Sequence, residues 1–119
     1  MSNQKIPPAL QEEINQAQKL EEELQVLNST IRVTKNNITE IESTIKELTE
    51  TEDNVVVYKL VGRIFINSEK PKVLEDLKDD LSNLEMRLKR FERNYESKKQ
   101  QFEELAKKIN QKIQTQSQA

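Results

Sequence analysis

The sequence predicts a mostly α-helical fold, in which two long helices form an antiparallel coiled coil with one central β-hairpin. Apolar residues recur with a seven-residue period in two long segments whose interiors contain neither glycine nor proline. Between these segments lies a short β-branched and aromatic run around the only glycine of the 119-residue chain. Hydrophobic residues make up 34% of the chain, below the roughly 45–50% of globular domains. We therefore expect a single domain over residues 1–119 that is held by a narrow helical seam.

The first helix is expected over residues 9–48. Pro7 and Pro8 precede it, and proline is tolerated in the first turn of a helix because its missing N–H would be unpaired there. All but two seam positions of this segment, Glu13 and Thr34, are apolar. The first series of seam positions is Leu10, Ala17, Leu24, Ile31, Ile38 and Ile45, and the second is Glu13, Leu20, Leu27, Thr34, Ile41 and Leu48.

A β-hairpin is expected over residues 55–67. Two short runs of β-branched and aromatic residues flank Gly62, which is expected to adopt a turn or bulge conformation that other residues resist. Both runs are almost continuously apolar, which indicates burial on both faces. Because an isolated two-stranded hairpin is marginally stable at best, something else must cover it.

The second helix is expected over residues 71–113, opened by Pro71 and followed by a polar tail that should fray. Lys98 and Lys112 are its polar seam positions. Its first series is Leu74, Leu81, Leu88, Tyr95, Phe102 and Ile109, and its second is Leu77, Leu84, Phe91, Lys98, Leu105 and Lys112.

The two helices are of similar length, as an antiparallel hairpin within one chain requires. A register that places Leu48 opposite Leu74 also places Leu10 opposite Lys112. The positions that flank the seam then bring opposite charges together, which favours this register. The predicted flanking pairs are Glu21 with Lys99, Lys35 with Glu85, and Glu42 with Lys78.

The polar seam residues Glu13, Lys98 and Lys112 all lie towards the chain ends, so we expect this end of the coiled coil to be less tightly closed. Ile14 and Ile113 occupy flanking positions there. They either widen the seam or contribute, with nearby apolar residues, to an exposed interaction site. The sequence leaves both alternatives open.

Composition argues against several functions. The chain contains no cysteine and no histidine, so disulfides and thiolate or imidazole chemistry are excluded, and a single glycine excludes a glycine-rich phosphate loop. The carboxylates lie on faces expected to be solvated, so no catalytic, cofactor or metal site is predicted. A net charge of −2 disfavours nucleic-acid binding. No segment is apolar enough to span a membrane and the start lacks a signal segment, so a cytoplasmic location is expected.

Residues 57–62 (VYKLVG), placed between two long heptad segments, resemble the β-class subunits of prefoldin. The opening IPP of residues 6–8 and the LEMRL of residues 84–88 are also similar to that family. The resemblance covers roughly residues 6–113. A single hairpin points to the β class, because α-class subunits carry a longer β insertion. Heptads alone are generic, whereas the central motif at this position is specific.

The resemblance implies a hexamer of two α-class and four β-class subunits, in which the hairpins join into a double β-barrel platform. The tips of the coiled coils would hold unfolded client proteins, without ATP, and pass them to a group II chaperonin. The resemblance places the oligomerisation residues at Val57, Tyr58, Leu60, Val61, Gly62, Ile64 and Phe65.

The client-binding tip is carried over by location only, because residue types at the tips vary within the family. It would comprise Ile6, Leu10, Ile14, Ile109 and Ile113. The alternative function is a structural coiled-coil scaffold or tether with one fixed partner. Such a scaffold would ignore most unfolded proteins, which distinguishes it from a chaperone. An enzyme is not expected.

Overall fold

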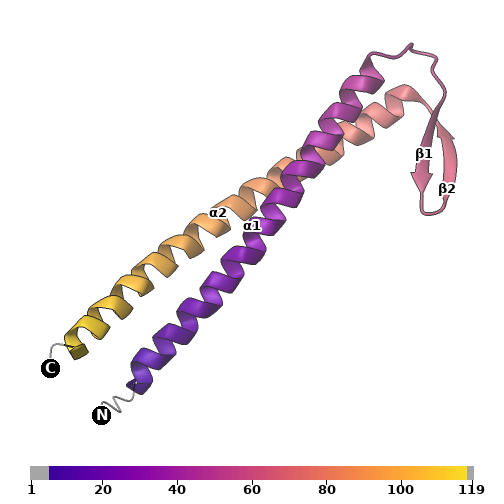
Figure 1. The fold of residues 1–119 in the computed structure, drawn as a ribbon. Helices are drawn as coiled ribbons and strands as arrows, with labels where there is room; N and C mark the ends of the chain where they lie inside the picture. Colours follow the sequence, from indigo (N-terminus) through magenta and orange to yellow (C-terminus); the bar gives the residue numbers. More distant parts are fainter. Residues whose placement is uncertain (1–5, 118–119) are drawn as a thin grey trace. The chain divides into compact units, whose positions relative to one another are not determined.

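The structure, a computed structural model, describes residues 6–117, and Figure 1 shows their course. Within this part the elements follow the order α1, β1, β2, α2. Residues 1–5 of the expected leader and residues 118–119 of the expected tail lie outside the described residues. The predicted class, two long helices around one antiparallel hairpin, is confirmed. The bounds are Pro8–Thr49 for α1, Val57–Val61 for β1, Ile64–Ser68 for β2 and Lys70–Ser117 for α2.

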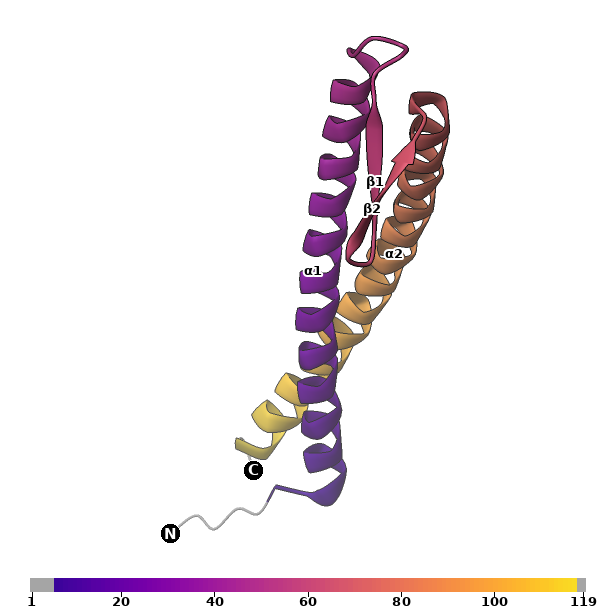
Figure 2. The ribbon, with the colours of Figure 1, turned by 90° about the vertical axis from the view of Figure 1, so that its right-hand side faces the viewer.

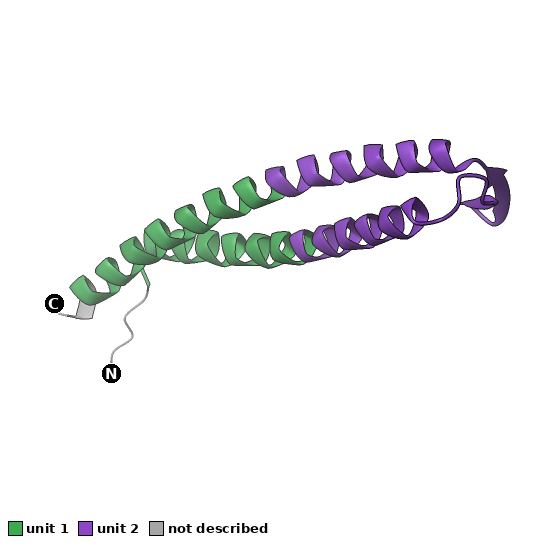
Figure 3. Cartoon of the chain, turned by 90° about the horizontal axis from the view of Figure 1, so that it is seen from above, with its two compact units in different colours: residues 1–30, 91–119 green, residues 31–90 purple. Residues whose placement is uncertain are grey.

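The chain divides into two compact units (Figure 3). Unit 1 combines residues 1–30 with residues 91–119, and unit 2 comprises residues 31–90. In each unit a segment of α1 lies beside a segment of α2 that runs in the opposite direction (Figures 1 and 2). Unit 1 contains both ends of the chain, and unit 2 contains the hairpin.

Proline opens both helices. Pro8 is the first residue of α1, and the carbonyl of Pro7 accepts the N–H of Gln11 at 2.9 Å. Pro71 is the second residue of α2, which begins at Lys70, one residue before the predicted start. Proline fits these positions because the first N–H groups of a helix have no partner within it. The second helix also continues to Ser117, beyond its predicted end at Ile113 and through part of the tail expected to fray.

The two strands form a hairpin with a two-residue loop, Gly62 and Arg63, in which Val61 pairs with Ile64 and Val57 with Ser68. Gly62 has a φ of 62°, whereas Arg63 does not have a positive φ. This combination is that of a type II′ turn, which matches the twist of the strands. The strand begins at Val57 rather than at the predicted residue 55. The reason is that the N–H of Val55 bonds instead to the carbonyl of Glu52, at 3.1 Å.

The seam between α1 and α2 is half-buried along most of its length, because each helix covers only one side of the other. Leu10 and Thr34 are the fully buried seam side chains among the described residues, with 3% and 7% exposure. Apolar residues away from the seam, Val26, Val33 and Met86, are more than half exposed. The fold therefore rests on one narrow apolar stripe in each helix and on the connections at the hairpin end.

Candidate functional site

The hairpin exposes a concentrated apolar surface. Phe65 is 72% exposed, and its apolar neighbours on the two strands are between 46% and 61% exposed. Ile66 was not among the predicted oligomerisation residues, although it belongs to the continuous apolar run that starts at Ile64. We call this set the hairpin surface; its members are Tyr58, Leu60, Val61, Ile64, Phe65 and Ile66.

Strand register assigns these side chains to two faces. Residues directly opposite each other in an antiparallel pair point to the same side of the sheet. Leu60 and its partner Phe65 therefore share one face, and Val61 and its partner Ile64 share the other. Of the remaining predicted oligomerisation residues, Val57 is half-buried at the start of β1 and Gly62 forms the turn. Both faces carry exposed apolar side chains, so the described chain leaves both unsatisfied.

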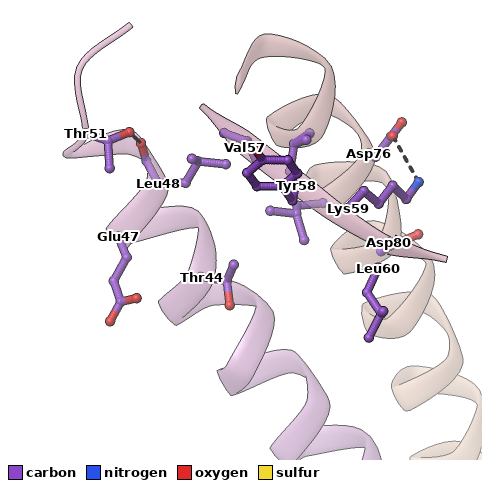
Figure 4. Close-up of a pocket in the computed structure, with 12 residues that line it drawn as sticks. Thr44, Glu47, Leu48, Thr51, Val57, Tyr58, Lys59, Leu60, Asp76 and Asp80 are labelled. Carbon is purple, nitrogen blue, oxygen red and sulfur yellow. Dashed lines mark hydrogen bonds and ion pairs between the residues drawn. The ribbon is translucent and has the colours of Figure 1, made fainter. Parts of the chain in front are cut away.

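An ion pair connects the hairpin to α2. The ammonium of Lys59 lies 3.5 Å from a carboxylate oxygen of Asp76 (Figure 4). The ammonium of Lys72 lies 3.5 Å from the other carboxylate oxygen of Asp76. Beside this pair is an open groove of about 470 Å³, whose apolar wall includes Leu48, Val57 and Leu77. Among the residues that the structure describes, no acidic cluster could hold a metal ion.

Lys70 ties the end of α1 to the start of α2, a role that sequence patterning does not reveal. Its ammonium donates to the carbonyl of Thr51 at 2.7 Å and to that of Thr49 at 3.4 Å, and it lies 3.7 Å from a carboxylate oxygen of Asp53. The Lys70 side chain is only 8% exposed. A cation at this place satisfies carbonyls at the negative end of the helix dipole, so Lys70 stabilises the base from which the hairpin starts.

The predicted client-binding residues differ in accessibility. Leu10 is only 3% exposed, although this end of the coiled coil was expected to be less tightly closed. Ile109 in the seam and Ile14 at its flank are half-buried, whereas Ile6 and Ile113 are 49% and 47% exposed. A groove of about 550 Å³ lies at this end of unit 1, lined by Pro7, Ala9, Leu10, Gln111, Lys112 and Thr115. Of the predicted set, Ile6 and Ile113 are therefore the residues most accessible to a partner.

The charged seam residues of unit 1 bond across the seam. Lys98 Nζ lies 2.5 Å from Glu23 Oε2, and Lys112 forms an ion pair with Glu13. The hydrogen bond from Lys98 is the main cause that lowers the pKa of Glu23 from its ordinary value. Glu13 Oε2 is buried and has no hydrogen-bond partner.

The three predicted flanking pairs are not formed among residues 6–117, so this prediction was wrong. The side chains concerned are exposed, and solvent competes for them. A lysine inside the seam lies closer to the facing helix, and its long stem carries the ammonium to an acid at the edge. The residues concerned are Glu21, Lys35, Glu42, Lys78, Glu85 and Lys99.

Over the described residues, neither helix offers an apolar stretch sufficient to cross a lipid bilayer. Among the described residues, the predicted sites that are accessible to a partner are the hairpin surface in unit 2 and Ile6 and Ile113 in unit 1.

Comparison with known proteins shows one consistent similarity. Residues 11–116 match a family model described as "Prefoldin subunit". The prefoldin subunit beta of Thermococcus onnurineus is 32% identical over 112 residues, covering 94% of this chain and 93% of the relative. That of Methanothrix thermoacetophila is 33% identical over 111 residues, covering 91% and 90%. The crystal structure of the prefoldin beta subunit from Thermococcus strain KS-1 superimposes with a TM-score of 0.81. It is 29% identical and covers 91% of this chain and 95% of that one.

Proposed function

Because the chain belongs to the prefoldin subunit family and to its β class, we propose that it captures unfolded proteins without ATP, prevents their aggregation and delivers them to a group II chaperonin. Members of the family are chaperone subunits that assemble with other prefoldin subunits. The proposed assembly is a hexamer of two α-class and four β-class subunits in the cytoplasm. The protein is proposed not to be an enzyme and to need no cofactor.

The exposed hairpin surface is the observation that carries the assembly part of the proposal. A chain that is only 34% hydrophobic nevertheless places a 72% exposed phenylalanine among half-exposed aliphatic side chains on both faces of a two-stranded sheet. Burial of these side chains against strands of other subunits would remove them from water and pair the free strand edges. We propose that the hairpin surface, with Val57 and Gly62, forms the oligomeric platform.

The exposed isoleucines of unit 1 support the client-binding part. Ile6 and Ile113 are about half exposed, and Ile14 and Ile109 from the same unit are half-buried. Small apolar contacts of this kind hold partners weakly and with little sequence preference. In this proposal Leu10 mainly supports the tip from inside, because it is 3% exposed.

Light scattering tests the proposed activity. Several unrelated denatured proteins are diluted from guanidinium, without ATP, into buffer with or without this chain assembled with its α-class partner. The proposal expects suppressed aggregation for all of them. A correctly sized complex that suppresses none of them would contradict the proposal and favour a scaffold with one fixed partner.

A matched pair of variants tests the location of the client site. Ile6→Ser with Ile113→Ser should reduce protection, whereas Val26→Ser with Val33→Ser should leave it unchanged. Val26 and Val33 are 67% and 55% exposed, so the control removes at least as much exposed apolar surface away from the chain ends. Equal loss in both variants would show that clients bind along the helices and not at the tip.

A further inference from the structure

Three charged residues occupy positions of the helix seam that elsewhere hold apolar side chains: Glu13 in α1, and Lys98 and Lys112 in α2. All three lie in unit 1. Lys98 bonds to Glu23 at 2.5 Å, and Lys112 bonds to Glu13. In unit 2, by contrast, the seam positions of residues 31–90 contain no charged side chain and one polar residue, Thr34.

Stability alone does not explain these charges. The side chains of Lys98 and Glu23 are 27% and 34% exposed, and those of Lys112 and Glu13 are 49% and 18% exposed. Ion pairs that remain partly solvated contribute little net stability. Leucine at the seam positions would bury more apolar surface, as it does in coiled coils generally. The charged residues are therefore better explained by the wrong helix pairings that they disfavour.

The same charges attract each other when α1 and α2 of one chain pair antiparallel, and repel each other when identical helices of two chains pair in parallel. Within one chain the antiparallel arrangement sets Lys98 against Glu23 and Lys112 against Glu13. In a parallel, in-register pair of two α2 helices from different chains, each seam residue would instead face its own copy. Lys98 would meet Lys98 and Lys112 would meet Lys112, while two α1 helices would set Glu13 against Glu13.

Apart from these lysines, the seam of α2 is apolar and self-complementary, so little else opposes its pairing with a second α2. Like charges held close together destabilise such a pair, and a single lysine in a coiled-coil seam is enough to specify the pairing state. Lys99 follows Lys98 directly and would add to the repulsion.

We propose that Glu13, Lys98 and Lys112 are specificity-determining residues that keep the helix pairs of neighbouring subunits apart. The need for them rests on the proposed function. Subunits joined at their hairpins hold their helices at an effective concentration of roughly millimolar. At that concentration an all-apolar seam would exchange partners between chains and bury the surfaces that are proposed to receive clients.

A cysteine reporter tests the proposal on the chain alone. The protein has no cysteine of its own, so Leu105→Cys, at a seam position of α2, gives a disulfide only with a second chain. A parallel in-register pair brings the two cysteines within the roughly 4.4–6.8 Å between Cα atoms that a disulfide needs. The reporter is compared in the wild-type seam and in a seam carrying Glu13→Leu, Lys98→Leu and Lys112→Leu. We expect about tenfold more linked dimer in the leucine seam, equivalent to ~1.4 kcal/mol.

The matched control exchanges charges without changing composition. Glu13→Lys combined with Lys112→Glu keeps opposite charges within the chain and like charges between parallel copies, so it should link no faster than the wild type. Equal linking in the wild-type and leucine seams would overturn the proposal, as would a charge-exchanged chain that links like the leucine seam.

A second experiment uses charge alone, in case the leucine variant fails to fold. One chain carries Glu13→Lys and Glu23→Lys, and another carries Lys98→Glu and Lys112→Glu. In the first chain all four paired positions are then lysine, and in the second all four are glutamate. Each chain repels itself across its own seam, but the charges of the two chains are opposite. Mixing them should raise helicity in circular dichroism and give a one-to-one species of doubled mass. A mixture that behaves as the sum of its parts would overturn the proposal.

Neither experiment uses a client or an α-class partner, so the outcomes of both are independent of the proposed chaperone activity.

Discussion

Lys98 Nζ lies 2.5 Å from Glu23 Oε2 and joins a seam position of α2 to the edge of the seam on α1. Both side chains are partly exposed, and the aliphatic stem of a lysine can lie along apolar surface while its ammonium reaches the rim. A residue that interrupts the apolar pattern of the sequence therefore makes a direct bond between the two helices of unit 1. Lys112 does the same with Glu13.

The pKa of Glu23 predicts how this contact responds to acid. The hydrogen bond from Lys98 lowers the pKa most, and the charges of Lys98 and Lys19 lower it further, although desolvation opposes them. A carboxyl whose pKa is lower in the folded state stabilises the fold above its unfolded pKa, and this contribution is lost as the pH falls through the folded value. Urea unfolding followed by circular dichroism should thus show a smaller acid-induced loss of stability, between about pH 5 and 3, for Glu23→Gln than for the wild type.

Glu22→Gln is the control for that experiment, because Glu22 is the exposed neighbour on the same helix. It should retain the wild-type pH profile. If Glu23→Gln also retains it, the bond to Lys98 does not persist in solution.

Gly62→Ala should destabilise the hairpin through its backbone. Gly62 has a φ of 62°, and a Cβ added there would meet no atom within 4 Å, so crowding plays no part. Holding an L-residue at a positive φ costs about 1–2 kcal/mol, whereas asparagine is among the residues that primed turns accept. Hydrogen exchange of the strand amides in the assembled protein should be roughly five- to thirtyfold faster for Gly62→Ala than for the wild type, with Gly62→Asn in between. Equal rates for alanine and glycine would show that the turn adopts another conformation.

Lys70→Met should destabilise the connection between α1, the hairpin and α2. The substitution keeps most of the aliphatic stem but removes the donor to the carbonyls of Thr49 and Thr51 at the end of α1. We expect a loss of about 1–3 kcal/mol in the free energy of unfolding, measured with urea. Asp53→Asn changes the exposed partner of the same lysine and should have an effect below about 0.5 kcal/mol. If the two variants lose the same stability, the carbonyl bonds of Lys70 contribute nothing beyond its surface charge.

Leu10 and Ile113 should separate stability from binding at the chain ends. Leu10 is 3% exposed and Ile113 is 47% exposed. Leu10→Ala should lower the free energy of unfolding by about 2 kcal/mol, at the low end for a buried leucine because the site is close to the helix ends. Ile113→Ala should lower it by less than about 1 kcal/mol. Chemical denaturation of both variants measures the difference, and a Leu10→Ala chain as stable as Ile113→Ala would indicate that the helix ends are open in solution.

Phe65→Asp tests the hairpin surface as the assembly interface. Burying an unpaired carboxylate between subunits is strongly unfavourable, so the large complex should be lost while the helical circular dichroism signal remains. Val26→Asp places the same charge on a side chain of similar exposure, 67% against 72%, and should assemble normally. Light scattering coupled to gel filtration distinguishes the two. An intact complex with Phe65→Asp would place the interface elsewhere.

Much of the fold could be predicted because its signals are local. The heptad period, the prolines at the helix starts and the lone glycine of the turn each act within a few residues. Errors arose at element ends, where other bonds compete: Val55 belongs to a turn because its N–H bonds to Glu52. The apolar runs of the hairpin were likewise visible in the sequence, although Ile66, in the same run as Ile64, was left out of the predicted set.

Heptad arithmetic placed Glu13, Lys98 and Lys112 in the seam. The side chains of Glu13 and Lys98 are partly buried, and that of Lys112 is 49% exposed but paired with Glu13. Periodicity did not predict these ion pairs, because it says which side of a helix a residue occupies and not how far its side chain reaches. The partners of these residues, the burial of Leu10 and the anchoring of α1 by Lys70 all depend on distances between segments remote in the chain. Those distances exist only once the helices pack, since a side chain's partner is set by the geometry of the facing element. The order of residues determines which segments form helices or strands and that the two helices pair antiparallel. Packing determines which of several neighbouring polar side chains bond to each other.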